Sequence, residues 1–258
     1  MENKKGLIIT IIILILLLLG SAGYIVYDKF FIKDEEEKEY INVIKDVSID
    51  VNKIYKVGEI LNKFDKAFST NDSNYFGYIY STPIIEVKDF DKNAAIYVSI
   101  YPELVRSNTE QTISNEIIKN KYENIFGKSL KYSPSGLELG DNIKVEYDSD
   151  NGIYKYTASI TNNEHKNEYL ARNMKTKLTD DLVIVTRKVF YVEYSNNNAI
   201  IYTNSSKKTK LGEVKLQNGE VSLQEVTGKY GSKINTYEVT FKLGSTDEYN
   251  FYKIERTK

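Results

Sequence analysis

Residues 143–160 read IKVEYDSDNGIYKYTASI, and they indicate their own structure more clearly than any other segment. Apolar and polar residues alternate from Ile143 to Asp148 and again from Ile153 to Ile160, the period expected of strands that bury one face. Between them, Asp150-Asn151-Gly152 is a hairpin signal, because Asn and Gly tolerate the positive φ of a tight turn. This segment predicts two antiparallel strands.

The pattern of short extended segments continues to the C-terminus. Further strands are predicted over Leu182–Tyr194, Ala199–Thr203, Val221–Val226, Tyr237–Leu243 and Tyr249–Glu255. The last two form a hairpin across Gly244-Ser245. Strands do not alternate with helices and there is no internal repeat, so the pattern excludes a doubly wound parallel sheet. We expect an α+β fold with a mostly antiparallel sheet over residues 128–258.

Residues 28–127 are expected to be mainly helical. The clearest helix runs from Asn115 to Phe126, with Ser114 as its N-cap and Gly127 as its stop. Asp91 caps a second, short helix that extends toward Val105. A longer amphipathic helix or helix pair has apolar residues at spacings of three and four, at Tyr40, Ile44, Val47, Val51, Ile54, Val57, Leu61, Phe64 and Phe68. Residues 75–90 are predicted to be extended and interrupted by Pro83.

An uncharged apolar run, GLIITIIILILLLLGSAGYIVY, occupies residues 6–27. At about 1.5 Å per residue it is long enough to cross a hydrocarbon core of about 30 Å. We therefore expect a transmembrane helix at 6–27 and a cytoplasmic tail at 1–5. More lysines follow the span than precede it, but long domains are exported largely regardless of charge. We accordingly expect the C-terminal region to be extracellular.

Two alternatives apply to this apolar run. Gly20-Ser21-Ala22-Gly23 would suit cleavage of a signal peptide, although apolar residues resume after it. Lys5-Gly6 resembles the leader of type IV pilins, but Leu7 and Ile11 stand where that family has an aromatic or Met and a Glu. An uncleaved signal-anchor is the main prediction, and a pilin-like envelope subunit is an alternative.

The layout also resembles the single-pass, membrane-anchored exported proteins of low-GC Gram-positive bacteria. The resemblance rests on the short lysine-bearing tail, the apolar helix, the helix that ends YENIFG at residues 122–127, and the tyrosine-rich hairpin from Tyr237 to Ile254. It implies a location in the cell envelope and no particular activity.

Composition excludes several kinds of function. The net charge is −1 without basic clusters, which argues against nucleic acid as a partner. The chain has no cysteine, and therefore no disulfide, thiolate nucleophile or cysteine-ligated metal. We expect no cofactor.

Three short patterns resemble sites, and each has a simpler explanation. His165, with Glu164 or Glu168, lacks the further ligands of a metal site and is interpreted as a loop residue. Ser205-Ser206-Lys207-Lys208 and Ser149-Asp150-Asn151 match two penicillin-binding motifs in reversed order without the third. Residues 148–152 resemble a calcium loop, but Gly152 is fifth rather than sixth. No catalytic, cofactor or metal residue is assigned.

The sequence favours a membrane-anchored extracellular protein without catalytic activity, which binds an envelope protein or a cell-wall polymer. An alternative function is a cell-wall hydrolase that uses carboxylates alone, since two carboxylates can meet in any cleft.

Overall fold

The computed structural model describes residues 51–69, 73–104, 107–140, 143–158 and 167–258. The chain divides into two compact units, residues 1–56 and 57–258. The second unit combines helices with two antiparallel sheets, so the predicted α+β class with an antiparallel sheet is confirmed. The predicted boundary at residues 127 and 128 stays a prediction.

The larger sheet is built around one long strand, β7 (Leu182–Ser195). Strand β6 (Glu168–Leu178) pairs with one edge of β7. The other edge pairs first with β10 (Asn235–Leu243) and then with β8 (Asn198–Tyr202). The sheet is completed by three further strands, β11 (Tyr249–Arg256), β1 (Ile84–Glu86) and β9 (Lys210–Lys215).

The smaller sheet contains the hairpin that residues 143–160 predicted. Strands β4 (Ile143–Asp148) and β5 (Ile153–Ala158) pair in register, Asp148 opposite Ile153. Strands β2 (Ser107–Ser114) and β3 (Leu137–Glu138) add to its two sides. The predicted hairpin is confirmed, and residues 159 and 160 lie outside the described residues.

The predicted caps hold two helices in place. Asp91 accepts a hydrogen bond from the Ala94 N–H at the start of α5 (Lys92–Ile100). Ser114 accepts one from the Glu116 N–H at the start of α6 (Asn115–Phe126), which ends at Gly127 with a φ of 58°. Both helices therefore begin where the sequence predicts.

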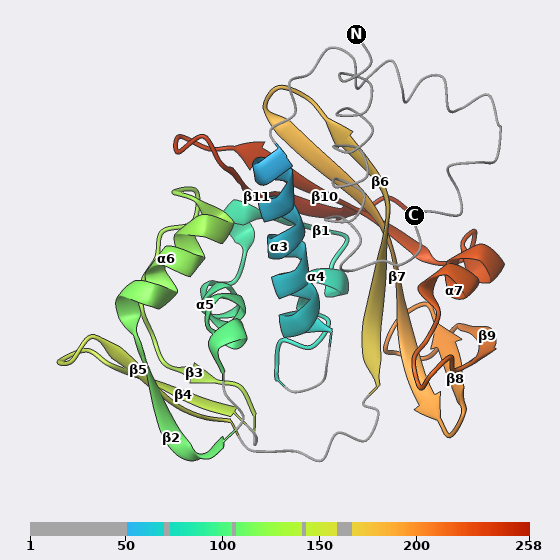
Figure 1. Ribbon diagram of the computed structural model, residues 1–258, viewed down its shortest axis with the longest axis horizontal. Helices are drawn as coiled ribbons and strands as arrows, with labels where there is room; N and C mark the ends of the chain where they lie inside the picture. Colours follow the sequence, from blue (N-terminus) through green and yellow to red (C-terminus); the bar gives the residue numbers. More distant parts are fainter. Residues whose placement is uncertain (1–50, 70–72, 105–106, 141–142, 159–166) are drawn as a thin grey trace, which may run out of the picture. The chain divides into compact units, whose positions relative to one another are not determined.

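Helix α3 (Val51–Phe68) contacts the larger sheet through Phe64 and Asp65. Phe64 is fully buried, and its ring lies 5.2 Å from Phe251 of β11 and 6.3 Å from Phe126 of α6. Figure 1 shows α3 beside α5 and the sheet. Helices and sheet strands thus share one aromatic core.

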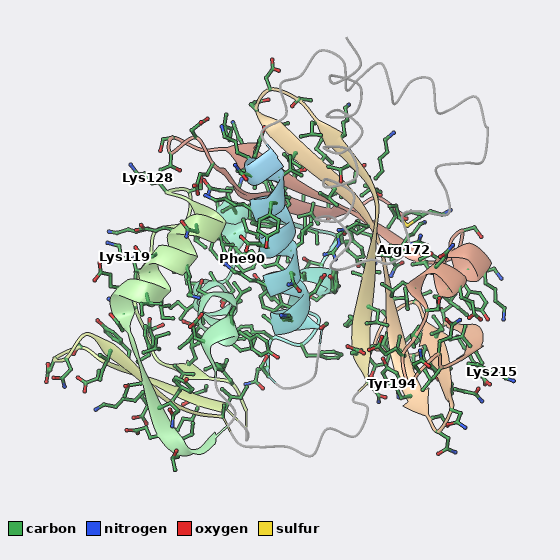
Figure 2. The ribbon with its side chains drawn as sticks, viewed as in Figure 1. Phe90, Lys119, Lys128, Arg172, Tyr194 and Lys215 are labelled. Atoms are coloured by element: carbon green, nitrogen blue, oxygen red, sulfur yellow. The ribbon has the colours of Figure 1, made fainter. Side chains whose placement is uncertain are left out.

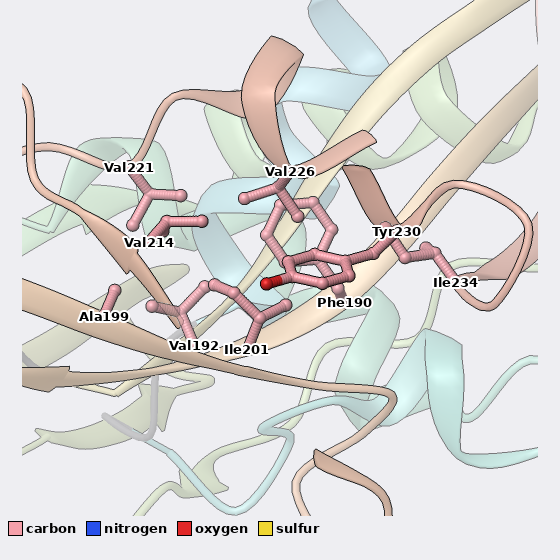
Figure 3. Close-up of a cluster of buried hydrophobic side chains, with 9 residues drawn as sticks. All are labelled: Phe190, Val192, Ala199, Ile201, Val214, Val221, Val226, Tyr230 and Ile234. Carbon is pink, nitrogen blue, oxygen red and sulfur yellow. The ribbon is translucent and has the colours of Figure 1, made fainter. Parts of the chain in front are cut away.

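A second core lies on the opposite face of β7, where helix α7 (Leu223–Tyr230) packs. Phe190 and Val192 of β7 point toward Val226 and Tyr230 of α7 (Figure 3). Because side chains of a strand alternate between its faces, β7 contributes to both cores and is buried along much of its length.

Two local predictions were wrong. Residues 221–226 were expected to form a strand, yet α7 begins at Leu223, because Ser222 caps it by accepting from the Glu225 N–H. Residues 75–90 are predicted to be extended with an interruption at Pro83, which is confirmed only for β1. Instead a short helix, α4 (Tyr78–Ser81), precedes β1, and a 3₁₀ turn (Val87–Asp89) follows it.

The predicted tail at 1–5 and transmembrane helix at 6–27 lie outside the described residues. Among the helices that are described, none combines the length and the apolar character needed to cross a membrane.

Candidate functional site

Strand β6 forms a long outer edge of the larger sheet. Of the described strands it pairs only with β7, and Figure 1 shows the two running side by side. Every residue from Asn173 to Lys177 is exposed, and Met174 retains 44% of its accessible surface. The other edge strands are shorter: β1 has 3 residues, β3 has 2, β9 has 6 and β2 has 8, against 11 in β6.

The first part of β6 is anchored to the rest of the fold. The Tyr169 N–H donates to the carbonyl oxygen of Ser69 at 2.8 Å. The Tyr169 hydroxyl donates to Ser205 Oγ at 3.0 Å, and its ring lies 5.3 Å from Tyr80 and 5.4 Å from Tyr191. The outward N–H of Tyr169 is therefore already hydrogen-bonded, and the open part of the edge begins after it.

The hydrogen bond from the Tyr169 N–H to Ser69 also shows which backbone groups of β6 point away from β7. Since the Tyr169 N–H points away from β7, alternation turns the N–H groups of Ala171 and Asn173 to the same side. A one-residue bulge between Asn173 and Lys175 shifts the register, which places the Thr176 N–H there as well. None of these three N–H groups has a hydrogen-bond partner among the described residues. The open edge thus runs from Ala171 to Leu178.

The side chains along this edge are basic on one face. Register places Arg172, Lys175 and Lys177 of β6 opposite Lys188, Thr186 and Ile184 of β7. We call Arg172, Lys175, Lys177 and Lys188 the basic face. No acidic residue occurs between Tyr169 and Leu178. Asp180 and Asp181 follow in the turn, and Glu238 lies on β10, beyond β7.

Contacts with α7 and the segment after it fix two members of the basic face. The Arg172 guanidinium donates to the Thr227 hydroxyl of α7, and Figure 2 labels Arg172 on its strand. Lys188 Nζ donates to the Gly231 carbonyl and the Thr236 hydroxyl, both at 2.8 Å. Partial burial lowers the pKa of Lys188, and the charge of Lys258 lowers it further. These two cations are held in position. Lys175 and Lys177 lie on the exposed part of the strand.

A buried ion pair holds the strand that carries β6. Arg187 of β7 is 2% exposed, and its guanidinium donates to both carboxylate oxygens of Asp65 on α3, at 2.9 and 2.5 Å. Tyr80 donates to the same carboxylate at 3.2 Å. Burial lowers the pKa of Arg187, but the Asp65 carboxylate more than offsets this, so the pKa lies above its ordinary value. The arginine is charged throughout the physiological range.

The patterns that resemble known sites remain separate in the structure. His165 and Glu164 lie outside the described residues. In the S-x-x-K pattern, whose lysine is Lys208, the intervening Lys207 pairs with Glu193 at 2.5 Å, and Ser205 contacts Tyr169. Asp148 pairs with Lys155 at 2.7 Å and accepts from Asn151, which closes the hairpin turn. The described residues contain no group of three or more His, Asp or Glu that could hold a metal.

Sequence reasoning missed β6. The segment EYLARNMKTKL alternates only at its start, and the bulge at Met174 then shifts the polar residues between faces. The neighbouring strand was the signal that could have indicated β6. A strand as long as Leu182–Tyr194 needs a neighbouring strand on each edge, because its backbone N–H and C=O groups must be hydrogen-bonded on both sides.

Comparison with known proteins gives little that constrains function. No family model and no solved structure matches the chain. One relative, a protein of Plasmodium falciparum (isolate 3D7), is 26% identical over 164 residues, which is 57% of this chain. The match spans 3% of the length of that protein.

This comparison corrects the prediction of a bacterial envelope protein. That prediction described a single-pass, signal-anchored protein of the cell envelope with an extracellular domain. The relative is a Plasmodium protein rather than a bacterial envelope protein. The assignment to a bacterial envelope is therefore wrong on this comparison, whereas the predicted location at a membrane depends on residues 6–27, outside the described residues, and stays a prediction. The pilin-like alternative rests on Lys5 to Ile11, outside the described residues, and the resemblance to Gram-positive exported proteins stays a prediction.

Proposed function

We propose that residues 57–258 form a non-catalytic binding domain, which takes up an extended segment of a partner protein as an additional strand beside β6. The supporting observation is the open edge from Ala171 to Leu178, whose outward N–H groups have no partner among the described residues. A sheet edge of this kind is a template for another strand, and backbone hydrogen bonds supply most of the affinity in such complexes.

The rigidity of the surrounding structure supports the same proposal. Tyr169 is tied to Ser69 and Ser205 at one end of β6, and the Arg187–Asp65 pair fixes β7 behind it. An edge that is already held in place loses little conformational freedom when a partner strand binds. A carboxylate-dependent hydrolase stays an alternative prediction.

A proline substitution tests this proposal directly. The Thr176 N–H points away from β7, so Thr176→Pro removes an outward donor without removing a hydrogen bond between β6 and β7. The full chain would be screened against a display library of short extended peptides. We expect wild type and Thr176→Val to select the same peptides and Thr176→Pro to lose them. Equal binding by all three proteins would overturn strand addition at β6.

A further inference from the structure

We propose that the strand accepted at this edge is acidic, an extended peptide segment with Asp or Glu at alternate positions. The inference rests on the proposed function and adds the chemistry of the partner. The geometry that carries it is the basic face, in which Arg172, Lys175 and Lys177 point to the same side of β6.

The spacing of these charges matches an added strand. Lys175 and Lys177 are two residues apart, and the bulge at Met174 brings Arg172 onto their face although it lies three residues from Lys175. Side chains of an added strand alternate with the same period of two, and those on the basic face lie directly opposite these cations. Carboxylates at every second position would therefore meet one basic side chain each.

The same side chains disfavour other strands. Lysines at a sheet edge normally prevent pairing, because a second strand would bury their charges without compensation. Pairing with a neutral strand would bury the lysine charges at this cost in free energy. Pairing with a basic strand would add repulsion between like charges. An acidic strand neutralises the lysines instead. The lysines of β6, which disfavour pairing with most sequences, thus favour acidic strands.

One further positive charge, on β7, adds to the three on β6. Lys188 lies opposite Arg172 on β7, and Nζ is held between Gly231 and Thr236. Other edges do not combine length with one sign of charge: β9 carries Glu213, paired with Lys210 at 2.6 Å, and β2 carries Glu110 with no basic residue. The basic face is also a single stripe on a chain with net charge −1, which suits a peptide better than a nucleic acid.

Fluorescence anisotropy on the full chain would test the inference with three labelled peptides, in which Thr alternates with Glu, Gln or Lys. We expect the Glu peptide to bind about tenfold more tightly than the Gln peptide, and the Lys peptide not to bind. Added salt should remove most of this difference. Lys175→Glu/Lys177→Glu should reverse the preference in favour of the Lys peptide, which also demonstrates that the variant is folded.

A matched control changes the same number of charges away from β6. Lys208→Glu/Lys215→Glu should bind the three peptides as wild type does. Equal binding of the Glu and Gln peptides, combined with loss in Thr176→Pro, would overturn the acidic partner and leave strand addition standing. Binding of no peptide would overturn both proposals. Displacement of the Glu peptide by single-stranded oligothymidylate at equal concentration would assign the basic face to nucleic acid and overturn the inference.

Discussion

Arg187 of β7 and Asp65 of α3 are joined by two hydrogen bonds, at 2.9 and 2.5 Å, and Arg187 lies opposite Asn173 of β6 in the sheet register. The ion pair therefore links the packed helix to the strand that carries the open edge. Arg187 is almost fully buried, whereas the Asp65 side chain is 33% exposed.

Removing the carboxylate should destabilise the fold. Asp65→Ala leaves a buried guanidinium without its counter-charge. We expect the free energy of unfolding to fall by about 3 kcal/mol. This is the lower end of the range for buried pairs, because Asp65 is partly exposed. Urea unfolding measures it. Lys210→Ala, which breaks the exposed pair with Glu213, should leave the free energy of unfolding unchanged. Similar losses in both variants would contradict a special role for the buried pair.

Tyr122 on α6 offers a substitution that should stabilise the protein. Its hydroxyl is buried and has no hydrogen-bond partner among the described residues. Tyr122→Phe removes that unsatisfied group and keeps the ring contacts with Phe126 and Tyr132, so we expect a gain of about 1 kcal/mol. A loss on urea unfolding would mean that the hydroxyl is hydrogen-bonded in solution.

Buried tyrosines should make the fold sensitive to alkali. Burial raises the pKa of Tyr122 to about 12, and burial together with Asp91 raises that of Tyr75 to about 12, against 10.0 ordinarily. Above pH 10 the unfolded chain releases these protons while the folded chain retains them, so stability is full below pH 10 and falls as the pH approaches 12. Tyr122→Phe should reduce the slope of the free energy of unfolding against pH over that interval, and an unchanged slope would contradict this assignment.

The cap of α7 can be tested in the same way. Ser222→Ala removes the acceptor of the Glu225 N–H and should cost about 1 kcal/mol in urea unfolding. Ser222→Asn, which retains a capping oxygen, is the control and should cost less. Equal losses would show that the cap contributes no specific stability.

Elements with strong local signals could be predicted from the sequence. The Asn-Gly turn between β4 and β5, the Ser114 cap of α6 and the Asp91 cap of α5 are decided by neighbouring residues alone. The stripe at Val57, Leu61, Phe64 and Phe68 is buried as its spacing indicates.

Elements whose structure depends on distant contacts could not be predicted. Residues 221–226 contain two valines and were assigned to a strand, although the pair Ser222 and Glu225 indicates a helix start. Strand β6 depends on β7 for its hydrogen bonds and on Ser69 for its anchor, and its own sequence alternates only at its start. The basic face could not be foreseen either, because the bulge at Met174 aligns side chains that an unbroken strand would place on opposite faces.

Amide hydrogen exchange on the full chain, with and without the peptide of alternating Glu and Thr, tests strand addition at β6 most directly. We predict slower exchange at the outward N–H groups of Ala171, Asn173 and Thr176 when peptide is bound, and no change along the edge strand Lys210–Lys215. Bound peptide with unchanged exchange at Ala171, Asn173 and Thr176, or with protection at Lys210–Lys215 instead, would contradict the account.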